Sequence, residues 1–79
     1  MLLNQCLVER QAEEIGKKIQ KARRSRGLSR KRLAQELGMN YVALYQWERG
    51  KNIKGIIKFF ELCKALDVKP DQFFPHNHN

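Results

Sequence analysis

The feature that most constrains this fold is a pair of short helical patterns within the stretch LSRKRLAQELGMNYVALYQWERGK, residues 28–51. Ser29 and Asn40 each stand just before a helical run, where their side-chain oxygens can cap the free N–H groups of a first turn. Gly38 ends the first run, because glycine readily adopts the left-handed backbone that closes a helix. Since only Met39 separates this glycine from the next cap, the helices must turn sharply, and we predict a helix-turn-helix.

Helical periodicity on both sides of this stretch predicts an all-α fold with five helices. Upstream, an apolar stripe recurs at spacings of three and four and should stop at Gly27; it consists of Val8, Ala12, Ile15, Ile19 and Ala22. Downstream, residues 51–55 form a loop, and a fourth helix carries the stripe Ile56, Phe59, Leu62, Cys63 and Leu66. Pro70 suits the first position of a short final helix. No alternating pattern argues for a sheet.

The positive charge is concentrated in one segment. The 79-residue chain has a formal net charge of +8, and residues 15–35 hold nine lysines or arginines and no acidic residue. Such clustering favours a polyanionic partner. Arg30, Lys31 and Arg32 even begin a helix, where cations oppose the helix dipole. A nucleic-acid phosphate docked there would meet free N–H groups, the Ser29 hydroxyl and the Arg30 guanidinium; otherwise these side chains simply extend into solvent.

Catalysis, metal binding and membrane insertion find little support in the sequence. The histidines, His76 and His78, lie in the terminal PHNHN, and neither Cys6 nor Cys63 has a ligand at metal-binding spacing. No nucleophile stands with a base and an orienting partner. Two cysteines do not make a disulfide framework, and no segment resembles a secretory signal or a membrane span. We therefore expect a cytoplasmic protein without metal or cofactor that is not an enzyme.

From residue 15 to about residue 74 the chain resembles the Cro and phage-repressor helix-turn-helix family, also called the XRE family. The segments that carry the resemblance are LSRKRLAQELGM, QWERGK and LCKALDVKPDQFF, and no internal gap is needed. The resemblance implies a compact, five-helix, lambda-repressor-like bundle at residues 15–74, whose third helix enters the major groove of double-stranded DNA. Residues 75–79 would be a flexible tail. Residues 1–14 could extend the first helix, strengthen a dimer or form a flexible arm.

The resemblance also implies roles for individual residues. The positions that contact base edges are Asn40, Tyr41, Val42, Tyr45 and Gln46, and those that bind backbone phosphates are Ser29, Arg30, Lys51, Asn52 and Lys54. Their chemistry agrees, because Gln46 can pair with N6 and N7 of adenine, and methyl groups or tyrosine rings can touch thymine methyls. For the two tyrosines, a partner interface or ordinary exposure stays open. Arg23 and Glu48 match a salt bridge that links the first helix to the third.

Three residues depart from the family pattern. Arg32 stands where an acidic residue is common, so no capping box forms, and Lys54 stands where a proline is frequent. Gly55 gives the fourth helix no capping side chain. We therefore expect a looser loop before the fourth helix.

One recognition helix contacts too few base pairs for strong specificity, so we expect a homodimer on a near-palindromic site. Four apolar residues either complete the core or form the dimer interface: Ile57, Phe60, Phe73 and Phe74. The resulting hypothesis is a sequence-specific transcriptional regulator, most simply a repressor. Two alternatives remain: an antitoxin or other protein-binding module that covers a toxin with residues 1–14, and an RNA-binding basic face.

Overall fold

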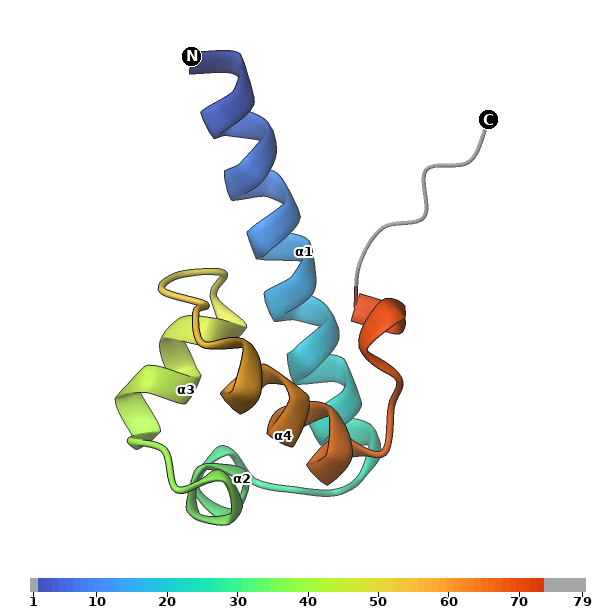
Figure 1. Cartoon of the computed structure of the whole chain (residues 1–79). Coiled ribbons are helices and arrows are strands. Elements are labelled where there is room, and N and C mark those ends of the chain that lie inside the picture. Colours follow the sequence, from blue (N-terminus) through green and yellow to red (C-terminus); the bar gives the residue numbers. More distant parts are fainter. Residues whose placement is uncertain (1, 74–79) are drawn as a thin grey trace.

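The structure is a computed structural model that describes residues 2–73, with side chains from Arg10 onward. Its elements are α1 (Leu2–Ser25), α2 (Arg30–Leu37), α3 (Tyr41–Glu48), α4 (Ile56–Leu66) and the 3₁₀ helix η1 (Pro70–Phe73). In Figure 1, the first half of α1 projects beyond the body that the other helices form around its second half. The described residues contain no strand, so the all-α prediction is confirmed.

The prediction of five α-helices is wrong, because the described chain has four. The expected final helix is the single 3₁₀ turn η1. Its backbone forms the i→i+3 hydrogen bond of a 3₁₀ helix, in which the N–H of Gln72 donates to the carbonyl of Lys69 at 3.0 Å. Pro70 contributes no N–H to an α-helical ladder, and this tight turn directs Phe73 into the core, where it is 2% exposed.

The helix-turn-helix forms through the predicted caps. The Ser29 hydroxyl accepts a hydrogen bond from the Arg32 N–H at 3.0 Å, and Asn40 Oδ1 accepts one from the Val42 N–H at 2.7 Å. Gly38 adopts the left-handed conformation, with φ of 64°, and closes α2. These local bonds end α2 and begin α3 within three residues, which fixes the turn between the two helices.

The core lies where the second half of α1 meets the other helices. It is built from Ile19, Leu33, Ala34, Leu37, Leu44, Trp47, Phe59, Leu62, Cys63, Leu66 and Phe73. The rings of Phe59 and Phe73 meet edge to face with centroids 5.6 Å apart, which joins η1 to α4. Burial raises the pKa of the Cys63 thiol, which is a free cysteine. The thiol therefore behaves as a small apolar side chain.

The structure contradicts the predicted burial of Ile56 and places Phe73 in the core, which is one of the two roles left open for it. Ile56 was predicted to lie in the buried stripe of α4 but is 68% exposed, because it is the first residue of that helix and precedes Phe59, the first buried residue of α4. Phe73 was a candidate for the dimer interface, but its side chain is already occupied in the core of one chain. Ile57 and Phe60 are exposed, whereas Phe74 lies outside the described residues.

Two glycines bring α1 and the C-terminal end of α3 into backbone contact. A β-carbon on Gly16 would lie 2.6 Å from the carbonyl oxygens of both Trp47 and Glu48. One on Gly50, whose φ is +79°, would lie 2.6 Å from the Cα of Glu13. Residues with a β-carbon therefore do not fit at these two positions, and this backbone contact fixes how closely α1 packs against the end of α3.

Candidate nucleic-acid interface

The exposed face of α3 presents two aromatic rings and an aliphatic side chain to solvent. Tyr41, Val42 and Tyr45 are 47%, 57% and 40% exposed, while Leu44 and Trp47 on the opposite face are buried. The two faces of α3 therefore differ, with core side chains on one and exposed rings on the other. Such an apolar surface on a helix of a small basic domain is a candidate contact surface for a partner.

Gln46 is held in place by a residue of the following loop. Asn52 Nδ2 donates a hydrogen bond to Gln46 Oε1 at 2.9 Å, from a left-handed backbone conformation with φ of 58°. The Gln46 side chain is half-buried, and its NH₂ group donates no hydrogen bond within residues 2–73. Because an oxygen has two lone pairs, Gln46 keeps one acceptor site and its donors for a partner. Asn52 therefore restricts the orientation of this amide.

A buried ion pair connects the first helix to the third. Arg23 Nε donates to Glu48 Oε2 at 2.7 Å, and Arg23 Nη2 donates to Oε1 at 3.3 Å. Arg23 Nη1 also donates to the Leu28 carbonyl at 2.8 Å, just before α2. The side chains of Arg23 and Glu48 are 8% and 1% exposed. One carboxylate thus joins α1, α3 and the entry to α2.

The Arg30 side chain bonds to other residues of the protein, which the sequence did not indicate. Its Nε donates to Glu48 Oε1 at 3.1 Å, and its Nη1 donates to the Tyr41 hydroxyl at 3.1 Å. Its guanidinium carbon lies 5.1 Å from the centre of the Tyr45 ring. Burial lowers the pKa of Arg30, but its hydrogen bonds to Tyr41 and Glu48 outweigh burial and raise the pKa above its ordinary value. Arg30 therefore stays charged beside the exposed face of α3.

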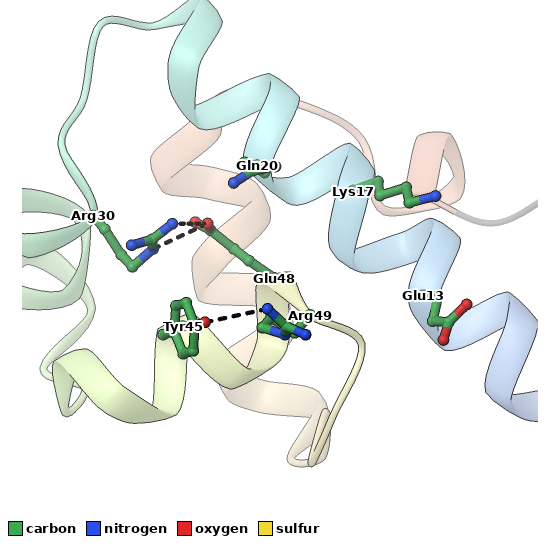
Figure 2. A pocket seen from close by; sticks show the side chains of 7 residues that line it. All are labelled: Glu13, Lys17, Gln20, Arg30, Tyr45, Glu48 and Arg49. Atoms are coloured by element: carbon green, nitrogen blue, oxygen red, sulfur yellow. Dashed lines mark hydrogen bonds and ion pairs between the residues drawn. The ribbon is translucent and has the colours of Figure 1, made fainter.

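Figure 2 shows a polar hollow between α1 and α3 that contains Arg30 and a second ordered arginine. Arg49 Nη1 donates to the Tyr45 hydroxyl at 3.2 Å, and its guanidinium carbon lies 5.7 Å from the centre of that ring. Tyr45 is thus held between the cations of Arg30 and Arg49. Arg49, which caps the C-terminal end of α3, was not among the residues that the sequence indicated for a site.

The candidate phosphate-binding residues lie at the start of α2 and in the loop after α3. Ser29 is exposed and caps α2. Lys51, Asn52 and Lys54 are exposed in the loop between α3 and α4 that Figure 1 shows in yellow. The structure therefore places cations and hydrogen-bond donors at both ends of α3, next to its exposed side chains.

The remaining described residues offer neither a metal cluster nor a membrane span. Within residues 2–73 no group of three or more histidine, cysteine, aspartate or glutamate side chains could hold a metal ion. In the same range, every helix is too short or too polar to cross a bilayer. His76 and His78 lie outside the described residues.

Comparison with known proteins gives one consistent family. A helix-turn-helix family model matches residues 19–73. The chain is 35% identical over 60 residues, 76% of its length, to an uncharacterized HTH-type transcriptional regulator of Rickettsia conorii, of which the match covers 48%. It is 28% identical over 60 residues to an uncharacterized transcriptional regulator in the ATPase CF(0) region of Rhodospirillum rubrum, covering 76% of this chain and 56% of the relative. The chain thus spans about half the length of the curated relatives it matches.

A solved structure resembles most of the chain. The crystal structure of the restriction-modification controller protein C.AhdI from Aeromonas hydrophila superposes with a TM-score of 0.74 and 27% sequence identity. The superposition covers 80% of this chain and 96% of that one. The likeness therefore extends across the helix-turn-helix and the helices that support it.

Proposed function

The chain belongs to the XRE-type helix-turn-helix family, and on that premise we propose that it regulates transcription by binding a specific double-stranded DNA sequence, most simply as a repressor. The observation that carries the proposal is the exposed face of α3, with Tyr41, Val42, Tyr45 and the oriented amide of Gln46. In this family geometry, α3 lies in the major groove and α2 crosses the backbone. We assign the DNA-binding domain to residues 15–74, and residues 2–14 form the first part of α1.

We assign base contacts to Asn40 and to these four side chains of α3. Gln46 retains the donor and acceptor that pairing with adenine N6 and N7 requires. Tyr41, Val42 and Tyr45 supply apolar surface for thymine methyl groups. The two tyrosine rings are already ordered by Arg30, so little side-chain freedom is lost when they meet DNA.

Phosphate contacts come from the start of α2 and from the loop after α3. The proposed residues are Ser29, Arg30, Lys51, Asn52 and Lys54. Phosphate contacts add affinity and salt dependence and position the helix on the duplex, while base contacts select the sequence. Arg30 and Asn52 also support base recognition indirectly, because each orients a side chain on α3.

The proposed regulator is a homodimer that binds a near-palindromic operator. Ile57 is 72% exposed and Phe60 45% exposed on α4, and Ile56 adds a third exposed apolar side chain. These residues leave apolar surface on a small domain that a second copy would cover. We assign the dimer interface to Ile57 and Phe60, together with Phe74 from the segment beyond η1.

Selection of random duplex DNA by the purified protein tests this function. At about 150 mM salt, where screening weakens long-range attraction, we expect enrichment of an inverted repeat whose half-sites are about one helical turn apart. A pool of structured RNA, selected in parallel, should enrich no motif. Enrichment of no duplex sequence, or stronger enrichment of RNA, would contradict the proposal.

A further inference from the structure

We propose that the hollow between α1 and α3 is a separate phosphate-binding site, in which Lys17 and Arg49 hold a phosphate of the DNA backbone. The proposal rests on the proposed DNA binding and adds a contact from α1. The phosphate would be bound by Lys17 and Arg49 rather than by the residues at the start of α2 or in the loop after α3, although Arg30 also lines the hollow.

The hollow is roomy and polar. Its volume is about 410 Å³, which exceeds by more than tenfold the roughly 30 Å³ that one water occupies in the liquid. Its lining residues are Glu13, Lys17 and Gln20 from α1, Arg30 from α2, Tyr45 and Glu48 from α3, and Arg49, which follows the last residue of α3 (Figure 2). All seven have polar side chains, so the hollow suits a hydrated, charged group rather than an apolar ligand.

The charges that remain available in the hollow favour an anion. Glu48 is already bound by Arg23 and by Arg30. Lys17 forms no ion pair with any residue in the described part of the chain. With Glu48 and its partners set aside, the lining keeps two cations, Lys17 and Arg49, and one carboxylate, Glu13. The Gln20 amide can add a neutral donor.

Arg49 is held in the hollow by Tyr45. Its Nη1 is fixed by the Tyr45 hydroxyl at 3.2 Å, and its guanidinium lies over that ring. A guanidinium carries five N–H donors, so this bond leaves donors for a phosphate oxygen. The backbone contact at Gly16 holds α1 against the end of α3 and so fixes Lys17 relative to Arg49.

The hollow joins the surface proposed for DNA at two places. Tyr45 belongs both to the hollow and to the exposed face of α3. A neighbouring hollow shares Glu13 and Arg49 and continues to Lys51 and Asn52 in the loop after α3. Cations therefore follow one path from α1, past the end of α3, to that loop. A DNA strand beside α3 would meet this path with its phosphates.

Removing the charge of Glu13 should change DNA affinity in the opposite direction to removing the charge of Lys17. If a phosphate enters the hollow, its negative charge is repelled by the Glu13 carboxylate and attracted by Lys17. Glu13→Gln should then strengthen DNA binding, while Lys17→Gln should weaken it. Lys21→Gln and Glu14→Gln are matched controls, because both residues are exposed on α1 and neither lines this hollow.

The experiment measures the binding of the full-length variants to the selected operator duplex by fluorescence anisotropy, between about 50 and 300 mM salt. Loss of one phosphate contact should reduce the slope of log K against log salt by about 0.9 and weaken binding about fivefold at 150 mM salt. We expect this for Lys17→Gln and a smaller effect of its control. Glu13→Gln should bind more tightly than both wild type and Glu14→Gln.

Equal slopes for Lys17→Gln and Lys21→Gln would overturn the proposal while leaving operator binding intact. Failure of the wild-type protein to select any operator would instead remove the proposed function. Inorganic phosphate alone, titrated at constant ionic strength and followed by the amide NMR signals of α1, identifies a free-anion site. Saturable shifts at Lys17 and Gln20 combined with an unchanged Lys17→Gln slope would overturn the assignment to DNA.

Discussion

Replacing Glu48 with alanine should come close to unfolding the protein. The Glu48 carboxylate is 1% exposed and accepts hydrogen bonds from both Arg23 and Arg30. Without it, the Arg23 guanidinium, which is 8% exposed, keeps only its bond to the Leu28 carbonyl. A buried charge that loses its partner destabilises a protein by about 3 to 5 kcal/mol.

That loss is large compared with the stability of a small domain. At roughly 0.05 to 0.15 kcal/mol per residue, a chain of this length has a free energy of unfolding of about 4 to 12 kcal/mol. Glu36→Ala is the matched control, because the Glu36 carboxylate pairs with Arg32 at 3.4 Å on the exposed side of α2. Removing such a surface pair should change stability by only about 0.3 to 0.5 kcal/mol.

Urea unfolding followed by Trp47 fluorescence and by circular dichroism measures both changes. The double variant Arg23→Met, Glu48→Leu should be less destabilised than Glu48→Ala, because it leaves no unpaired charge at the centre of the cluster. A free energy of unfolding for Glu48→Ala within about 1 kcal/mol of wild type would refute the reasoning. A double variant less stable than Glu48→Ala would show that the unpaired charge is not the cause.

Three further outcomes are expected. Gly16→Ala should lower the free energy of unfolding by about 1 to 3 kcal/mol, because its β-carbon would lie 2.6 Å from two carbonyl oxygens of α3; a thermal melt equal to wild type would exclude that close contact. Gln46→Ala should lose about 1 to 3 kcal/mol of preference at one base pair of each half-site in a repeated DNA selection, and unchanged preferences would remove Gln46 from base recognition. Cys63 should react slowly with a thiol reagent in the native Cys6→Ser variant, because burial raises its pKa; labelling as fast as in urea would contradict its burial.

The sequence was sufficient to predict the parts of the fold that depend on local bonds. Ser29, Gly38 and Asn40 act within a few residues of their own positions, so their residue types alone indicate where α2 begins and ends and where α3 begins. The buried face of α3 follows from helical periodicity in the same way. Periodicity failed at Ile56 because it carries no information on where the neighbouring elements end.

The arrangement of charged side chains could not be predicted from residue types alone. Arg30 was expected to face a phosphate, yet its partners Glu48 and Tyr41 lie 18 and 11 residues further along the chain. Choosing between these partners and solvent requires the packing angle of α2 against α3. Phe73 was likewise ambiguous until the 3₁₀ turn showed its direction.

One feature of the sequence, Gly16, indicates the close contact beside the hollow that contains Lys17 and Arg49. Gly16 interrupts an otherwise regular helical pattern, and a glycine inside a helix often marks the close approach of another backbone. That approach joins residues 13–20 of α1 to the end of α3. The identity of the approaching segment is a tertiary fact, so the sequence could locate the contact on α1 but not its partner.

The most direct test of DNA recognition is to map the contact surface by amide NMR while the selected operator duplex is added to the protein. We expect the largest shift changes at residues 40–46 and at the start of α2, with smaller changes in the core of α4. A duplex with the same composition in scrambled order should shift the phosphate-binding residues but leave Gln46 and Val42 little changed. Identical shifts with both duplexes, or changes confined to α4, would contradict sequence recognition by α3.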